Sequence, residues 1–200
     1  MDIFLSVWTK MRAASREMID NRSVAFAIFL YAIGGIGSMM TGLLDSELDF
    51  PVIGILLFCM IAGPIAIVLM QFIVVAVIYL VGKLFKGNAQ FMELYKALSL
   101  GYIPFIVIIP FFTIWMATDI DSLIYTDVTP TGIIPILTIF VTLVMVVYSF
   151  AIQIVAISEA NGFSKWKAFF TIFIPGVVFF ILLFIIVIAI TILVIGVSIL

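Results

Sequence analysis

Six carboxylates gather in two short segments of this sequence, and they are its most chemically capable side chains outside an apolar setting. They are Asp45, Glu47, Asp49, Asp119, Asp121 and Asp127. A hard cation such as Ca²⁺ prefers oxygen ligands, and carboxylates that lie close together can provide them. Three acids in a short loop more often form an ordinary solvated turn facing outward, so we expect no metal site here and keep a cation site as the alternative.

The chain has few other residues of the types that carry out catalysis or bind metals. The chain has no histidine, which removes the commonest general base and the commonest metal ligand. Its single cysteine, Cys59, lies in an apolar run, so neither a disulfide framework nor a cysteine metal site is available. The glycines at 34–37 do not form a nucleotide loop, because no strand precedes them and no Lys-Ser/Thr pair follows. We therefore expect a non-enzymatic protein without a cofactor or metal and without nucleic-acid binding.

The positions of the basic residues predict the elements that hold the acidic clusters in place. All nine Lys and Arg fall in three islands between apolar runs, whereas the six clustered acids occupy the other two polar breaks. The islands are Lys10, Arg12, Arg16 and Arg22; Lys83, Lys86 and Lys96; and Lys165 and Lys167. The chain is 66% hydrophobic and 10% charged, against about 25% charged in soluble domains. Alternating basic and acidic breaks are typical of a chain that crosses a membrane repeatedly with its basic loops in the cytoplasm.

Five apolar runs approach or exceed the roughly 20 residues that a bilayer crossing requires. We predict spans at 23–44, 51–82, 101–118, 133–158 and 168–200. Two passes within 51–82 would place Lys83 and Lys86 on the side of the acids, so we predict one tilted pass bent at Gly63-Pro64. The predicted fold is an all-α polytopic membrane helical bundle of five transmembrane helices, with a cytoplasmic N-terminus and a C-terminus outside.

Residues 1–22 form a separate predicted unit before the five-span domain at 23–200. The first apolar run is too long for a signal peptide, so we expect this segment to be retained. Apolar residues such as Phe4, Trp8 and Met11 recur at helical spacing and predict a short amphipathic N-terminal helix over 3–20, lying in the headgroup region. It either anchors the first span or docks a partner. A second interfacial helix is expected at 91–100.

Small and polar residues inside the spans are candidates for helix packing or partner contacts. They are Gly34, Ser38, Gly42, Gln71 and Gln153. The first three recur every fourth residue and allow another helix to approach closely, from the same chain or from a second subunit. The two amides either hydrogen-bond between helices or bind a substrate. No charged residue lies in the interior of a span, which argues against ion- or proton-coupled transport.

Basic and aromatic residues in the cytoplasmic loops are candidates for an interface. They are Trp8, Lys83, Lys86, Lys165, Trp166 and Lys167. A tryptophan between two lysines is typical of an anchor at the membrane surface, with its charges near lipid headgroups. A binding site around Trp166 is the alternative. We expect membrane lipids among the partners of this surface.

Three motifs resemble those of the Yip1 family of five-span membrane proteins. The segment from Tyr79 to Leu98 is similar to the family's basic loop after its second span. Gly101-Tyr-Ile-Pro104 resembles its Tyr-x-Pro entry into the third span. Gly162-Phe-Ser-Lys-Trp-Lys-Ala168, with Ile174-Pro175, is similar to its Gly-x-Ser-x-x-Lys-Ala-like loop before the fifth span, although Trp166 and Lys167 alter that pattern.

The resemblance carries expectations about function. Eukaryotic members act in vesicle trafficking and bind prenylated GTPases through a long N-terminal region, whereas this chain has 22 residues there. It looks more like the short bacterial members, several of which are accessory to ABC-type export or to defence against membrane-active peptides. We expect a multi-pass adaptor of the bacterial cytoplasmic membrane that binds lipids or membrane proteins, with an ABC transporter or a second copy as candidates. A passive channel, permease or lipid-moving protein is the alternative, because prolines bend helices that can line a cavity.

Overall fold

The computed structural model describes residues 2–48 and 50–198, without the side chains of 182, 186, 189, 190 and 192–198. These ranges are helical apart from turns and loops. The helices are α1 (Ile3–Thr9), α2 (Met11–Asn21), α3 (Val24–Thr41), α4 (Val52–Leu84), α5 (Phe91–Leu98), the 3₁₀ turn η1 (Ser99–Tyr102), α6 (Ile103–Thr118), α7 (Asp121–Ile124), α8 (Ile133–Asn161) and α9 (Lys165–Ser198).

Five helical segments are long and apolar enough to cross a membrane, which confirms the predicted all-α five-span fold. They are Val24–Thr41, Val52–Leu84, Phe91–Thr118, Ile133–Asn161 and Lys165–Ile185. The long run at 51–82 forms the single helix α4, with Pro64 inside it. The last residues of the predicted fifth span, 199–200, lie outside the described residues. Which end faces the cytoplasm stays a prediction from the charge pattern.

The third span begins before the predicted boundary at residue 101. The side chains of Gln90 and Glu93 form a capping box that starts α5, and the helix passes through η1 into α6. Leu94, Tyr95 and Leu98 are buried, and α5 contacts α2, α4 and α8. The segment expected to lie at the surface is therefore packed inside the bundle as the first part of this span.

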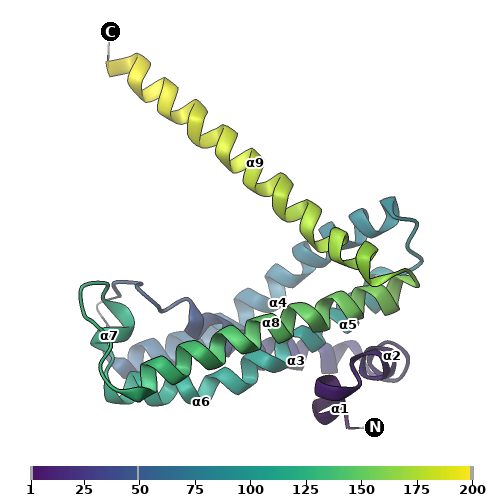
Figure 1. Cartoon of the computed structure of the whole chain (residues 1–200), viewed down its shortest axis with the longest axis horizontal. Helices are drawn as coiled ribbons and strands as arrows, with labels where there is room; N and C mark the ends of the chain where they lie inside the picture. Colours follow the sequence, from purple (N-terminus) through teal and green to yellow (C-terminus); the bar gives the residue numbers. More distant parts are fainter. Residues whose placement is uncertain (1, 49, 199–200) are drawn as a thin grey trace.

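Two short helices replace the single helix expected over 3–20. The backbone turns at Lys10, where φ is −130° and ψ is 51°. Asp2 caps α1 by accepting a hydrogen bond from the amide of Phe4 (3.0 Å). The break lets both helices bury one face, through residues such as Val7 in α1 and Met18 in α2. Figure 1 shows α1 and α2 beside the bundle, at the end where α9 begins.

The core consists of two clusters stacked along the bundle. One surrounds Tyr31 and Tyr95 near the N-terminal helices. The other surrounds Phe112, Trp115 and Leu123 near α7. The helix α3 contacts both α4 and α6, so it lies in the middle of the bundle and contributes residues to both clusters.

The last helix, α9, leaves the bundle after its first turns. Ala168 and Thr171 are buried against neighbouring helices, and α9 contacts α8 and α4. Figure 1 shows its remainder diverging from the other helices. Side chains farther along, such as Phe179 and Phe180, are exposed. This apolar surface suits contact with lipid.

Candidate functional site at the basic end of the bundle

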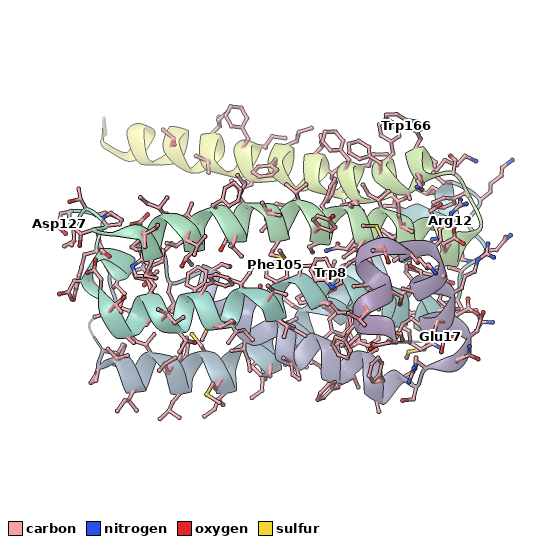
Figure 2. The ribbon with its side chains drawn as sticks, turned by 60° about the horizontal axis from the view of Figure 1, so that its bottom comes forward. Trp8, Arg12, Glu17, Phe105, Asp127 and Trp166 are labelled. Atoms are coloured by element: carbon pink, nitrogen blue, oxygen red, sulfur yellow. The ribbon has the colours of Figure 1, made fainter. Side chains whose placement is uncertain are left out.

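The two ends of the bundle differ in charge. Figure 2 shows Arg12, Glu17 and Trp166 close to one end and Asp127 at the opposite end. We call the first the basic end; it comprises residues 8–22, 83–96 and 159–167. We call the second the acidic end; it comprises residues 43–48 and 115–131. The candidate site lies at the basic end, because three separate segments meet there.

Glu159 joins the N-terminal helices to the last turn of α8. Its Oε1 lies 2.8 Å from Nε of Arg12, and its Oε2 lies 2.7 Å from Nε of Arg16. The carboxylate side chain is only 6% exposed, whereas the two arginine side chains are 68% and 71% exposed. One buried acid therefore holds two basic side chains whose outer faces remain in solvent.

A second joint, centred on Lys96, connects α5 to the end of α2. The ammonium of Lys96 donates hydrogen bonds to the carbonyl oxygens of Ile19 and Arg22. Carbonyls at the end of a helix lack partners within the helix, and a cation there is favourable. The loop before α5 is held as well, since the amide of Asn88 donates to the carbonyl of Asn161 (3.2 Å).

Two of the six predicted interface residues are engaged within the chain. Lys83 donates to the carbonyls of Gly87 (3.2 Å) and Ala89 (3.0 Å), and its ammonium lies 5.1 Å from the ring centroid of Tyr79. The ring of Trp8 lies 5.5 Å from that of Tyr148 on α8. These two residues fix the shape of the basic end.

The other four predicted interface residues are exposed. They are Lys86, Lys165, Trp166 and Lys167. Trp166 is 73% exposed, and its ring lies edge-on to that of Phe169, with ring centroids 6.2 Å apart. Gly162 ends α8 in the left-handed conformation, with φ of 68°, which brings the start of α9 back beside α8. Their role as an interface stays a prediction.

A cavity of about 430 Å³ opens between the N-terminal helices and the start of α9. Its lining residues are Trp8, Thr9, Lys10, Met11, Arg12, Ala13, Val155 and Lys165. The break at Lys10 creates this cavity, because the turn between α1 and α2 forms most of its wall. Periodicity alone gives no signal for the cavity, since the apolar spacing continues unbroken across residue 10.

Glycines of α3 allow close packing inside the bundle. Gly34 lies against Tyr102, and a Cβ on Gly35 would come within 2.8 Å of the carbonyl oxygen of Gly63 on α4. A Cβ on Gly37 would overlap the carbonyl oxygen of Phe105 on α6. Of the other predicted stripe residues, Ser38 is half-buried, and Gly42 is exposed beyond the end of α3. The closest approaches therefore use Gly37, which the four-residue spacing did not select, and the predicted Gly34, whose Cβ would come within 2.5 Å of the carbonyl oxygen of Tyr102.

The two predicted amides bond within the bundle, on either side of η1. Gln71 on α4 donates to the hydroxyl of Tyr102 (2.6 Å). Gln153 on α8 donates to the hydroxyl of Ser149 (3.2 Å), which in turn donates to the carbonyl of Gly101 (2.7 Å). These contacts join α4 and α8 to the turn that links α5 with α6. In this arrangement the amides contribute to interhelical packing.

At the acidic end, backbone groups of the loop after α3 hydrogen-bond to the end of α7. The amide of Asp45 donates to the carbonyl of Leu123 (3.1 Å), and the amide of Glu47 donates to that of Ile124 (3.0 Å). Among the described residues, no three acids, cysteines or histidines come together as a metal site. Asp49 lies outside the described residues. The cation hypothesis therefore gains no support from the described part of the acidic loops.

Asp119 is the acid of this end whose titration is shifted. Ser122 donates to it through its backbone amide (3.4 Å), and the hydroxyl of Thr131 donates to its other oxygen (3.4 Å). The hydrogen bonding from Ser122 is the largest cause, and the pKa of this carboxyl is lowered from its ordinary value. Hydrogen bonds to the charged form favour that form.

Comparison with known proteins places the chain in a family through nearly all of its length. No curated protein and no solved structure matches it. The family model of the Yip1 domain matches residues 5–198. This range includes α2, all five spans and the loops of the basic end. The chain therefore belongs to the family of Yip1 domain proteins.

Proposed function

We propose that the protein is a non-enzymatic integral membrane adaptor that binds a partner membrane protein through its basic end, which faces the cytoplasm. The observation that carries this proposal is the assembly of the basic end from three distant segments. Glu159 pairs with Arg12 and Arg16, and Lys96 bonds to the end of α2. The basic loops are therefore built into one surface with a fixed shape.

A fixed charged surface is suited to recognition. Ordering flexible side chains and loops on binding lowers affinity, and a surface that is already assembled avoids much of that cost. Exposed cations such as Lys86 and Lys167 would attract an acidic surface and orient it as it approaches. The partner that fits has an acidic cytoplasmic face next to its membrane spans.

The family suggests where to look for such a partner. Short bacterial proteins resembling this chain include accessories of ABC-type exporters and of defence against membrane-active peptides. An ABC-type exporter has both membrane spans and cytoplasmic domains, so it offers both kinds of surface. We therefore propose the bacterial cytoplasmic membrane as the location and an exporter of this type as the first partner to test.

Site-specific photo-crosslinking in native membranes tests the proposal. A photoreactive residue replaces Lys86 or Trp166 at the basic end, and the matched control replaces Asp127 at the acidic end. We expect a discrete adduct from the basic end that weakens with added salt, because exposed charges are screened. The same abundant neighbours recovered from both ends would contradict the adaptor proposal.

The alternative of a passive channel, permease or lipid-moving protein draws on the prolines. Pro64, Pro110 and Pro175 lie inside α4, α6 and α9, where they remove a backbone donor and loosen the helix. Purified protein in proteoliposomes distinguishes the two functions. Sustained solute flux or lipid scrambling without any partner would favour the alternative over the adaptor.

A further inference from the structure

We propose that the cavity between α1, α2 and the start of α9 binds the phosphate headgroup of an anionic phospholipid. The cavity is defined above by its eight lining residues and its volume of about 430 Å³. This inference depends on the membrane location of the proposed function but not on any protein partner. It assigns a specific ligand to a part of the basic end that a partner protein does not need to touch.

The charge of the cavity fits a phosphate. Lys10, Arg12 and Lys165 line it, and none of its eight lining residues is acidic. Lys10 and Lys165 are exposed, so their ammonium groups can move towards a ligand. Arg12 pairs with Glu159 through Nε, and its side chain is 68% exposed. A guanidinium carries five donors, so it can hold Glu159 and still offer donors to an anion.

The cations come from two parts of the chain. Lys10 lies between α1 and α2 and Arg12 lies in the first turn of α2, whereas Lys165 begins α9. Because Glu159 fixes α2 against α8, the opposing walls of the cavity are held at a set distance. The first turn of α2 also lines the cavity, and Lys10 at its N-cap makes no side-chain hydrogen bond there. The amides of this turn add partial positive charge.

The apolar wall selects a lipid over a free phosphate ion. Trp8, Met11 and Val155 line the cavity beside the cations, and Trp8 packs against Tyr148. Val155 lies in the last two turns of the span α8, and Lys165 is the first residue of the span α9. The cavity therefore lies at the level where spans end, which is the level of the headgroups in a bilayer. A phospholipid presents its phosphate and its apolar glycerol ester region at this depth.

Native mass spectrometry of the purified full chain in detergent tests the proposal. The probes are phosphatidylglycerol and phosphatidylcholine, which share acyl chains but differ in net charge. We expect phosphatidylglycerol to be retained in preference to phosphatidylcholine. Replacing Lys165→Gln or Lys10→Gln should weaken its retention about fivefold each, since one basic residue near an anionic lipid surface has an effect of this order.

Matched controls separate a site from a diffuse charge effect. Lys167→Gln removes a lysine two residues from Lys165 that does not line the cavity, and it should leave retention unchanged. Lys165→Arg keeps the charge and should also keep retention. Equal losses in Lys165→Gln and Lys167→Gln would overturn the site, as would equal retention of the two lipids by the unmodified protein.

A competition arm identifies the source of the phosphate. Inorganic phosphate added in excess should leave phosphatidylglycerol bound, because it lacks the apolar part. Full displacement by inorganic phosphate would overturn the assignment to a lipid. Crosslinking of the Lys10→Gln and Lys165→Gln variants in native membranes keeps the two proposals apart. A discrete partner adduct that persists while lipid retention shows no preference would overturn only the lipid site.

Discussion

The basic and acidic ends of the bundle hold their loops in opposite ways. At the basic end, side-chain charges join distant segments, as in the pairing of Glu159 with Arg12 and Arg16. At the acidic end, Asp45 and Glu47 contribute their backbone amides to Leu123 and Ile124. Side-chain ion pairs therefore join distant segments at the basic end, whereas backbone hydrogen bonds, an apolar cluster and the hydrogen bonds to Asp119 hold the acidic end.

The difference shows that loops that obey the same rule of membrane topology can be held in place by different interactions. Both sets of loops follow the rule that basic residues stay on one side of the membrane. Within the described part of the chain, only the basic end also contains a buried partner of opposite charge, because the side chain of Glu159 is 6% exposed. We infer that substitutions of charged residues affect stability mainly at the basic end, and that substitutions of apolar residues matter most at the acidic end.

The largest expected effect is that of Trp115→Ala at the acidic end. Trp115 is 1% exposed, packs against Phe112 and donates from Nε1 to the hydroxyl of Ser122 (3.0 Å). Truncation leaves a cavity, so we expect a loss of about 3–5 kcal/mol in the free energy of unfolding. Thermal unfolding of the purified protein in detergent measures this. The control Trp115→Phe keeps most of the packing and should cost about 1–2 kcal/mol; equal effects of the two would contradict an apolar origin.

A smaller effect is expected from Glu159→Gln at the basic end. The change removes the charge that holds two arginines, and we expect a loss of about 1–2 kcal/mol because both arginine side chains are mostly exposed. Hydrogen exchange should rise in α1 and α2 and stay constant in α7. The matched control is Glu17→Gln, since Glu17 lies 3.7 Å from Arg22 and should contribute less. An equal rise in hydrogen exchange in both variants would contradict the claim that Glu159 holds the N-terminal helices in place.

Acidification should loosen the acidic end through Asp119. Its folded pKa is lowered by hydrogen bonds from Ser122 and Thr131. The stabilisation is therefore fully present above the ordinary carboxyl range near about pH 3.9 and is lost as the pH falls through the lower folded value. Fluorescence of Trp115, in a protein with Trp8→Phe and Trp166→Phe, reports this transition. Asp119→Asn should abolish it, and a midpoint above the ordinary range would contradict the assignment.

The smallest expected effect is that of Asp45→Asn, which removes a charge without a described ion pair. The amide of Asp45 makes the contact with Leu123, and its φ of 55° is one that asparagine also adopts readily. We expect a change within about 0.5 kcal/mol in the free energy of unfolding. Thermal unfolding beside Glu159→Gln measures the contrast. A loss as large as that of Glu159→Gln would show that the loop after α3 also depends on its carboxylates.

The number of spans and the length of most of them could be predicted because both are local properties of the sequence. Apolar length and the separation of basic from acidic breaks can be read without knowing any contact. The same information was sufficient to identify 51–82 as one helix. It was insufficient for the third span, because Gly101 and Pro104 look like a break. The structure bridges them with the 3₁₀ turn η1.

The joints of the basic end could not be predicted, because they depend on which helices become neighbours. Glu159 is separated from Arg16 by 143 positions, and no local pattern in the sequence connects them. The turn at Lys10 has no local signal either, since the helical periodicity continues through it. Likewise, the sequence indicated a small-residue face on α3, but Gly35 becomes critical only because Gly63 lies opposite.

The pairing of Arg16 with Glu159 also sets an order of events during synthesis. The two residues are 143 positions apart, and a ribosome adds roughly 5–20 residues per second. For on the order of ten seconds, α2 exists without the acid that fixes it. We expect the N-terminal helices to remain exchangeable until α8 has been made, so the basic end is completed only after four of the five spans.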